Sequence, residues 1–278
     1  MPNSGVDLAL ARENVIEPSA SKIRPLEKKS LPRTFGLKDV FTCINLLGGT
    51  LSIIFCLESN IRYAAYAFLL GYLLGDSLDG LVARVTHTGN RFGAEFDAIS
   101  DHLAQCIAPA CIVFASYRDL SFFLAAALAA LIVITGSIRH ARSAVVKANF
   151  PLAYIGLPRT ASAFIIVSFL NSTLFLQMPG GRWAGVPLLV LLSIAHVLRL
   201  PFRTHRGRKM ELYVKLLIAG FFTTTVGALL FFPKFVFDVT FAWLFGYTCG
   251  SWIAMRPEER RAFFLRAKEW ATEIRQAR

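Results

Sequence analysis

Four aspartates lie in a short, otherwise apolar stretch of this sequence, and their spacing has a clear chemical meaning. The first two are three residues apart and the last two are four residues apart, so each pair shares one face of a helix. Ionised carboxylates in apolar surroundings need a compensating partner, because burying one unpaired costs several kcal/mol. The four residues are Asp76, Asp79, Asp97 and Asp101.

The segment between the two pairs predicts a turn. Residues 86–91 are polar and include Gly89 and Asn90, which favour a reversal of the chain. Two antiparallel helices would then bring all four carboxylates together at one face of a membrane. Because carboxylates in one pocket repel each other, we expect divalent cations that prefer oxygen ligands, Mg²⁺ or Mn²⁺, and two ions rather than one.

The neighbours of these acids suit a phosphate-containing ligand. Gly80 and Gly93 remove side chains beside the carboxylates, which would let a ligand approach the backbone. Arg84 lies about one turn beyond Asp79 and offers a forked donor to a phosphate. The alternatives are helix packing for the two glycines and an interfacial anchoring role for Arg84.

The composition predicts an all-α polytopic membrane protein. Hydrophobic residues make up 55% of the 278 residues and charged residues only 17%. Several apolar runs approach or exceed the roughly 18 residues that suggest a membrane span. The pattern predicts about eight transmembrane helices, at residues 39–57, 62–82, 95–116, 120–145, 155–176, 184–200, 211–232 and 236–254.

The basic residues predict the orientation of these helices. Of the 30 Lys and Arg residues, 26 fall in the two tails and in alternate connections, on one side of the predicted bundle. By the positive-inside rule that side is cytoplasmic, so both termini and the acidic site would face the cytoplasm of a cell (inner) membrane. The net charge of +12 then reflects topology and attraction to anionic lipid, and it predicts no nucleic-acid partner.

The sequence divides into three parts. Residues 1–35 are polar and Pro-containing and predict a flexible basic cytoplasmic tail. Residues 36–255 form one predicted transmembrane domain. Residues 256–278 carry apolar and charged residues at near-helical spacing, which predicts either a cytoplasmic amphipathic helix or a solvated tail.

The acidic pattern resembles the signature of the CDP-alcohol phosphotransferase family. It reads Asp-x2-Asp-Gly-x2-Ala-Arg-x8-Gly-x3-Asp-x3-Asp from Asp76 to Asp101, with every position met and Ala83 as the alanine. The resemblance implies a six-helix core, here followed by two C-terminal helices. It also implies two divalent ions held by the four aspartates and contacts from Gly80, Ala83, Arg84 and Gly93 to the nucleotide and phosphates.

Further segments are similar to the bacterial phosphatidylserine synthase branch of this family. The resemblance implies that CDP-diacylglycerol donates a phosphatidyl group to the hydroxyl of L-serine with release of CMP, in a homodimer. Asn45 would contact the nucleotide, and Arg139 and Arg142 would bind a lipid phosphate or the serine carboxylate. Arg159 stands in a stretch that is less charged in the family; it could bind the same groups as Arg139 and Arg142, and the alternative for all three is interfacial anchoring. The similar segments are Asn45–Gly49, Phe92–Asp101, Ile107–Ala110, Arg139–Arg142, Tyr154–Pro158 and Arg199–Arg203.

These patterns support a mechanistic hypothesis and leave alternatives open. Asp101 would ligate the second ion and act as general base toward the acceptor hydroxyl. Glycerol 3-phosphate, inositol phosphate or inositol could replace serine in the same chemistry, with Arg139, Arg142 and Arg159 binding a phosphorylated acceptor. A transporter also fits intramembrane carboxylates, and a catalytically inactive lipid-binding homologue is the remaining alternative.

Overall fold

The computed structural model describes residues 35–78, 82, 91–145, 153–203, 212–253, 255 and 257–276. The chain divides into two units, Met1–Phe35 and Gly36–Arg278, and all described helices belong to the second. The predicted basic tail lies outside the described residues except for Phe35.

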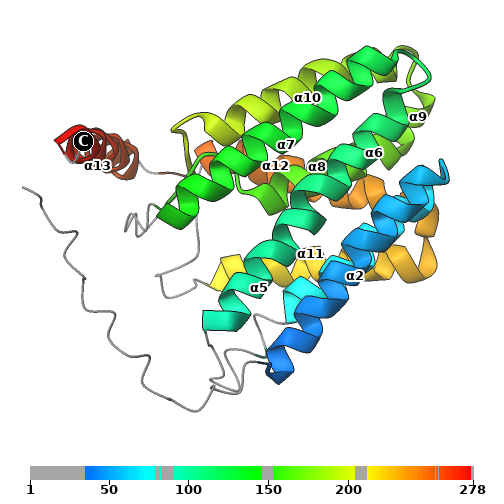
Figure 1. The fold of residues 1–278 in the computed structure, drawn as a ribbon, viewed down its shortest axis with the longest axis horizontal. Coiled ribbons are helices and arrows are strands. Elements are labelled where there is room, and N and C mark those ends of the chain that lie inside the picture. The colour runs from blue at the N-terminus through cyan, green and yellow to red at the C-terminus, as the bar shows by residue number, and fades with distance from the viewer. Residues whose placement is uncertain are drawn as a thin grey trace, which may run out of the picture. The chain divides into compact units, whose positions relative to one another are not determined.

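Helices account for nearly all of the described structure, and each of the eight predicted spans contains at least one helix. The all-α polytopic architecture is therefore confirmed (Figure 1). The elements in chain order are α2 (Leu37–Leu57), α3 (Ile61–Gly71), η1 (Tyr72–Asp76), α5 (Arg91–His102), η2 (Leu103–Ile107), α6 (Ala108–Tyr117), α7 (Phe122–Val145), β1 (Ala153–Ile155), α8 (Arg159–Asn171), α9 (Thr173–Gln177), α10 (Gly181–Val197), β2 (Pro201–Arg203), α11 (Leu212–Phe231), η3 (Pro233–Phe235), α12 (Val236–Ile253) and α13 (Pro257–Gln276).

Several of these helices are long and apolar enough to cross a membrane. By length and composition, four described segments qualify, and the third predicted span is continuous through α5, η2 and α6. They are Leu37–Leu57, Phe92–Tyr117, Phe122–Ser143 and Arg159–Gln177, and Gly181–Val197 and Lys215–Phe231 are shorter apolar helices. Because many of their side chains are exposed on the outside of the bundle, lipid is the environment that suits them.

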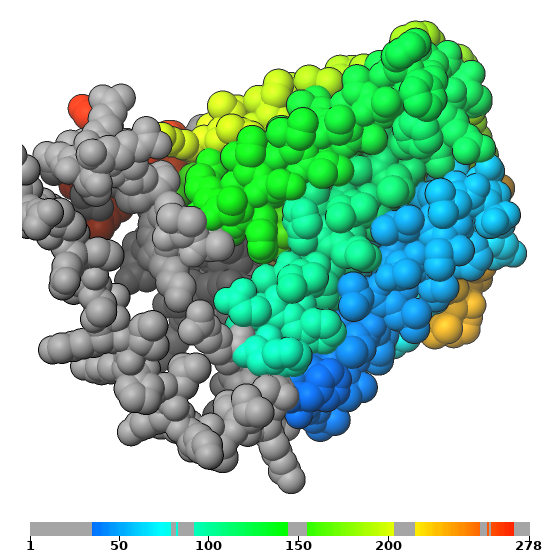
Figure 2. Space-filling model, viewed as in Figure 1, coloured from blue at the N-terminus to red at the C-terminus, as the bar shows by residue number. Residues whose placement is uncertain are grey.

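The helices that carry the acidic residues pack against one another around α2. This helix contacts α3, η1, α5, η2 and α6, and α6 in turn contacts α7 and α8. Figure 2 shows α2, the α5–α6 segment and α7 next to one another on one face of this unit. The core is apolar and includes Leu69, Ile112, Ile165 and Leu189, each almost fully buried. Residues far apart in the sequence are thus held in a fixed arrangement.

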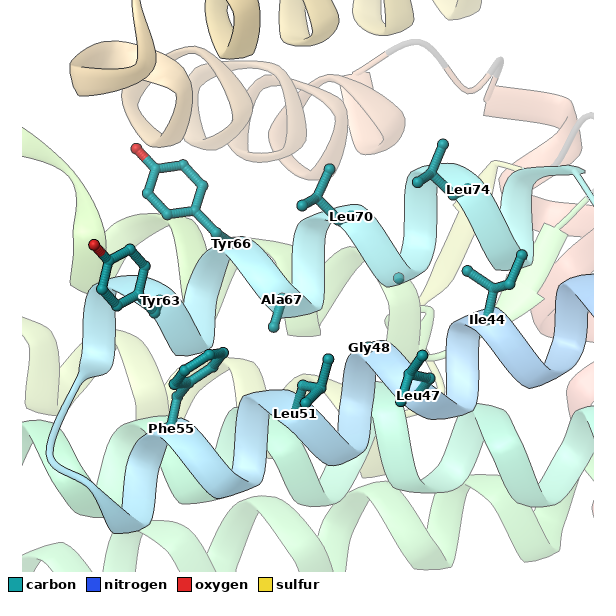
Figure 3. Close-up of a pocket in the computed structure, with 11 residues that line it drawn as sticks. Ile44, Leu47, Gly48, Leu51, Phe55, Tyr63, Tyr66, Ala67, Leu70 and Leu74 are labelled. Atoms are coloured by element: carbon teal, nitrogen blue, oxygen red, sulfur yellow. The ribbon is translucent and has the colours of Figure 1, made fainter.

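A close contact between α2 and α3 sets the spacing at one side of the site. A Cβ added at Gly48 would lie 2.8 Å from the carbonyl oxygen of Ala67 and would overlap the backbone of Gly71. Only glycine lets the two helix backbones come this near to each other. Above this contact the two helices leave an open apolar groove of about 320 Å³, lined by residues such as Leu51, Leu70 and Leu74 (Figure 3).

A short β-ribbon, which the sequence analysis did not predict, joins two connections between helices. Strands β1 and β2 pair antiparallel, with Ala153 opposite Arg203 and Ile155 opposite Pro201. Each strand has three residues, which is too short for the alternation of side chains to signal it in the sequence. The ribbon links the end of α7 to the end of α10, close to the end of the bundle that carries the acids.

The predicted C-terminal amphipathic segment is a helix. In α13, Phe263 and Ala267 are buried with Met255, and Ile155 packs against this cluster. Phe264 and Leu265 on the same helix are exposed. The helix is therefore attached to this unit by one face, and its binding to a membrane surface stays a prediction.

Candidate active site and metal centre

Three of the four predicted metal ligands come together in the structure. Asp76 ends η1, and Asp97 and Asp101 lie one turn apart on α5. Each offers one carboxylate oxygen, and these three oxygens all lie within 4.8 Å of one another. Asp79 lies outside the described residues. The three described acids therefore form one cluster, as the sequence predicted, and the predicted turn at residues 86–91 lies outside the described residues except for Arg91.

One oxygen of this cluster is buried without a partner. Oδ1 of Asp97 is inaccessible to solvent and has no hydrogen bond within the described part of the chain. A buried carboxylate oxygen without a donor is costly, and a cation is the group that would satisfy it. An all-oxygen set of three carboxylates also matches the ligand preference of Mg²⁺ and Mn²⁺. The residues present thus fit a divalent ion.

Both spans that carry the acids contain a π-helical turn beside them. Segment η1 ends at Asp76, and η2 follows directly after the helix that carries Asp97 and Asp101. A π turn accommodates one extra residue and reorients the side chains on either side of it, and such turns are frequent at functional sites. The sequence offers no periodic signal for them, because each occupies only five residues.

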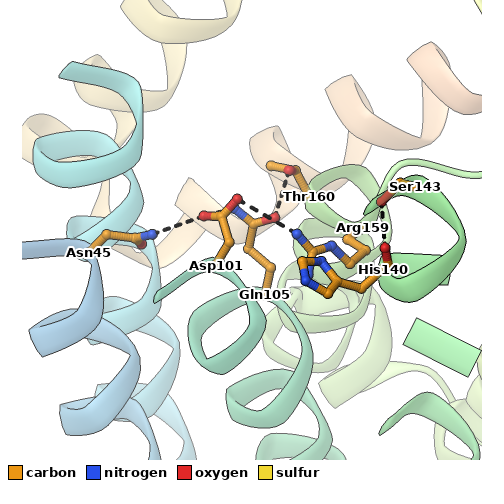
Figure 4. Close-up of polar contacts among 7 residues, drawn as sticks. All are labelled: Asn45, Asp101, Gln105, His140, Ser143, Arg159 and Thr160. Carbon is orange, nitrogen blue, oxygen red and sulfur yellow. Dashed lines mark hydrogen bonds and ion pairs between the residues drawn. The ribbon is translucent and has the colours of Figure 1, made fainter. Parts of the chain in front are cut away.

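Asp101 contacts three neighbouring side chains from different parts of the fold (Figure 4). Its Oδ1 accepts hydrogen bonds from Asn45 Nδ2 at 3.2 Å and from Gln105 Nε2 at 2.8 Å. Its Oδ2 lies 3.8 Å from Nη2 of Arg159, and the two side chains are 19% and 11% exposed, respectively. These contacts hold the carboxylate in one orientation, as a positioned base requires.

Helix α8 supplies the cationic side of this site. Arg159 and Thr160 form its first turn, and Thr160 Oγ1 donates to Oε1 of Gln105 at 2.8 Å. The sequence analysis did not assign Gln105 or Thr160 to the site and gave Arg159 only an alternative role. Gln105 follows Asp101 by four residues, so helical spacing is a signal that could have found it. The placement of α8 depends on long-range packing.

Asn45, which was predicted to contact the nucleotide, lies in the site. It can approach the first acidic segment closely because Gly75 has no side chain. A Cβ added at Gly75 would overlap the backbone nitrogen of Asn45 and would lie 2.7 Å from its Cβ. Because Gly75 precedes Asp76, this contact fixes the separation between α2 and the first acidic segment. Asn45 reaches Asp101 in the structure, and its contact with a nucleotide stays a prediction.

A further carboxylate lies on the same face of α2 and was missed by the sequence analysis. Asp39, Thr42 and Asn45 follow one another at three-residue intervals and are all buried. Oδ2 of Asp39 accepts a hydrogen bond from the backbone nitrogen of Gly36 at 2.8 Å. Its Oδ1 is buried and lacks a hydrogen bond among the residues that the structure describes. Asp39 thus stabilises the start of α2 and adds negative charge near α5.

Arg142, predicted to bind substrate, has its guanidinium on backbone carbonyls. Its Nη1 donates to Val197 at 2.9 Å, and its Nη2 donates to His196 at 2.9 Å and to Ile155 at 3.0 Å. A cation at these carbonyls stabilises the C-terminal end of α10, where the last carbonyls lack helical partners. The contacts therefore support a structural role, and a substrate-binding role for Arg142 stays a prediction.

The remaining predicted residues are less informative. Arg139 is half-buried on α7, and Gly93 is buried in the first turn of α5, where its carbonyl accepts a hydrogen bond from Lys38 Nζ at 3.3 Å. The predicted roles of Gly80, Ala83 and Arg84 concern positions outside the described residues.

Comparison with known protein families identifies the family to which this chain belongs. Residues 36–198, which hold every acid and amide described above, match the CDP-alcohol phosphatidyltransferase family. The chain belongs to this family. CDP-alcohol phosphatidyltransferases use divalent metal ions, and the cluster of Asp76, Asp97 and Asp101 is suited to hold one.

Individual relatives narrow the comparison. A CDP-diacylglycerol–serine O-phosphatidyltransferase of Helicobacter pylori is 34% identical over 131 residues, which is 46% of this chain and 54% of the relative. One of Methanocaldococcus jannaschii is 31% identical over 50% of this chain and 63% of its own length. An archaetidylserine synthase of Methanothermobacter thermautotrophicus is 30% identical over 62% of this chain and 73% of its length. The chain thus spans about half the length of the first of these CDP-alcohol phosphatidyltransferases.

Proposed function

We propose that this protein is a multi-pass membrane enzyme that transfers a phosphatidyl group from CDP-diacylglycerol to the hydroxyl of L-serine, giving phosphatidylserine and CMP. The observation that carries the proposal is the carboxylate cluster with its buried, unpartnered Asp97 oxygen. The names of the relatives, which act on serine or form archaetidylserine, favour serine as the acceptor.

The chain's own residues supply binding and proton transfer. Asp76, Asp79, Asp97 and Asp101 would hold Mg²⁺ or Mn²⁺. Bound divalent ions offset the charge that develops on phosphate oxygens during displacement. Arg84, Gly80, Ala83 and Gly93 would face the nucleotide and its phosphates, with Asn45 beside them.

Asp101 is the proposed general base. Asn45 and Gln105 both donate to its Oδ1, so the carboxylate is oriented before the acceptor arrives. Asp101 takes the hydroxyl proton while the serine oxygen forms a bond to the diacylglycerol-linked phosphorus. The bond from that phosphorus to the CMP oxygen breaks, and CMP leaves. Proton removal matters because a serine hydroxyl is a poor nucleophile at neutral pH.

The orientation in the membrane is also proposed. The positive-inside bias places the acidic site and both termini on the cytoplasmic side of the cell (inner) membrane. Arg139 and the apolar faces around the site would contact the lipid donor, and the active form would be a homodimer. Serine and a cytidine nucleotide are both water-soluble groups, so an active site at the cytoplasmic face would reach them directly.

The test is CMP release by the purified protein in detergent with CDP-diacylglycerol and Mn²⁺. L-serine, glycerol 3-phosphate, inositol phosphate and inositol would be supplied separately, with and without EDTA. We expect release with serine, its loss in EDTA, and a decrease of about 10²-fold or more in Asp101→Asn, in line with the usual contribution of a general base. CMP release with a different acceptor would keep the phosphatidyl-transfer reaction and replace serine as the assigned acceptor. If a folded, metal-loaded sample releases no CMP with any acceptor, the proposed enzymatic activity is refuted, and a transporter or an inactive homologue is favoured.

A further inference from the structure

A second polar cluster lies beside the acidic site and is not used by the reaction steps above. Arg159 on α8, His102 on α5 and His140 on α7 come from three different helices. The two imidazole rings have their centroids 5.5 Å apart, and the guanidinium interacts electrostatically with both rings. Figure 4 shows the guanidinium of Arg159 directed toward Asp101, with the ring of His140 beside Arg159 in this view.

Each member of this cluster has a buried nitrogen that the described residues leave unpaired. These atoms are Nη1 of Arg159, Nδ1 of His102 and Nδ1 of His140. Buried polar atoms are nearly always hydrogen-bonded in folded proteins, so three unpaired nitrogens on neighbouring side chains indicate a missing ligand. Because a guanidinium only donates hydrogen bonds, that ligand must carry acceptor atoms.

The hydrogen-bonding state of His102 fits an anionic ligand. Its Nε2 lies 3.4 Å from Oγ of Ser137. Because Ser137 lies next to Nε2, Nδ1 is the ring nitrogen left for a ligand, and a hydrogen on Nδ1 can be donated to an acceptor atom. Arg159 and His102 would then both present donors, and a forked guanidinium matches the geometry of a carboxylate.

The position of the cluster links it to the acceptor. Arg159 Nη2 is 3.8 Å from Asp101 Oδ2, so the guanidinium adjoins the proposed base. In serine, a short carbon chain joins the hydroxyl to the carboxylate. An acceptor whose hydroxyl contacts Asp101 therefore has its carboxylate within reach of Arg159.

We propose that Arg159, together with His102 and His140, binds the carboxylate of an α-amino acid acceptor and selects it over neutral alcohols. The inference rests on the proposed function and adds a specificity site to it. Of the three arginines that the sequence offered for the carboxylate contact, Arg139, Arg142 and Arg159, it selects Arg159.

The experiment compares L-serine with L-serinamide, in which a neutral amide replaces the carboxylate. CMP release is measured for both acceptors with CDP-diacylglycerol and Mn²⁺. In the wild-type protein we expect kcat/KM to favour serine. In Arg159→Gln we expect the KM for serine to rise roughly 10- to 100-fold, the range for losing a hydrogen bond to a charged group. The KM for serinamide should change little, so the preference for serine is lost.

Three further variants separate binding from other effects. Arg159→Lys keeps the charge and should retain part of the preference, whereas His140→Gln should weaken it in the same direction without removing the guanidinium. Arg182→Gln is the matched control, because Arg182 pairs with the exposed Asp119 away from the site and should behave like the wild type. Equal losses of kcat for both acceptors in Arg159→Gln, with the preference unchanged, would mean that Arg159 only positions Asp101 and would overturn the proposal.

A binding measurement distinguishes failure of this inference from failure of the proposed reaction. The thermal stability of the Mn²⁺-loaded protein is recorded with L-serine, L-serinamide and glycerol 3-phosphate. A shift with serine in the wild type but not in Arg159→Gln supports the site even if no CMP is released. No shift with serine, or an Arg159-dependent shift with glycerol 3-phosphate alone, overturns the carboxylate assignment.

Discussion

The contact between Gly75 and Asn45 provides a sharp test of how the fold sets the site geometry. In Gly75→Ala the new Cβ would lie 2.7 Å from Asn45 Cβ and 2.8 Å from Asn45 Cα, and it would overlap the backbone nitrogen. Since carbon atoms in contact prefer about 3.5–4.0 Å, α2 and η1 must separate by roughly 0.7–1 Å. The obstacle is largely helix backbone, so a change of rotamer cannot relieve it.

Two effects of Gly75→Ala on stability oppose each other: the displacement of the helices destabilises the fold, and the helix preference of alanine stabilises it. Alanine favours a helix over glycine by about 1 kcal/mol, whereas overpacking costs about 1–3 kcal/mol, so the net loss of stability should be modest. Activity should suffer more, because Asp76 is the next residue and Asn45 bonds Asp101. A misplacement of about 1 Å can reduce turnover by about 10²-fold, and we expect kcat/KM for CMP release to fall by roughly 10- to 100-fold.

The matched control is Gly227→Ala on α11, where nothing lies within 4 Å of the added Cβ. We expect that variant to keep wild-type turnover and to be at least as stable as the wild type, because only the helix preference of alanine acts there. Mn²⁺ affinity, followed by electron paramagnetic resonance, reports on the acidic cluster independently of turnover. Wild-type turnover and wild-type Mn²⁺ affinity in Gly75→Ala would refute the reasoning that this contact sets the distance between α2 and the acids.

Two further predictions concern the metal and the opposite end of the bundle. Asp97→Asn should weaken Mn²⁺ binding by roughly 10²-fold or more, since it removes the charge from a buried, unpartnered oxygen. The control Asp119→Asn changes an exposed carboxylate and should leave Mn²⁺ affinity unchanged. Equal Mn²⁺ affinity in the two variants would contradict the assignment of Asp97 as a metal ligand. Arg62→Ala should lower stability by about 2–3 kcal/mol, because its guanidinium bonds the carbonyls of Asn171, Pro233 and Lys234. Thermal unfolding in detergent measures this loss. Arg118→Ala is the control and should cost less stability, because the side chain of Arg118 bonds only the hydroxyl of Ser59 among the residues that the structure describes. CMP release per folded molecule should stay unchanged in Arg62→Ala, since Arg62 lies about 20 Å along the helix from Asp76.

The sequence was most informative where spacing and composition repeat locally. Each of the eight predicted spans contains a helix, because runs of apolar residues of that length have few other solutions. The convergence of Asp76 with Asp97 and Asp101 also followed from the sequence, because a polar turn between two helices makes them antiparallel neighbours. The predicted roles of these residues as ligands and base remain predictions.

Other features depended on helices that are distant in the sequence. Arg142 and Arg159 look alike in the sequence, as basic residues near the ends of predicted spans. The structure places Arg142 on the carbonyls at the end of α10 and Arg159 against Asp101. Which direction a long side chain takes depends on the helices that pack beside it, and those contacts come from remote parts of the chain.

The sequence by itself determined that this protein is a polytopic helical membrane protein with an acidic site between its second and third spans. Those properties follow from local periodicity, from the cost of burying charge and from the length needed to cross a membrane. Only the tertiary structure decided which neutral and cationic side chains complete the site. Asn45 and Arg159 reach Asp101, and Thr160 reaches Gln105, because α2 packs against α5 and α8 packs against η2 and α6. That packing depends on shape complementarity between segments that are distant in the sequence.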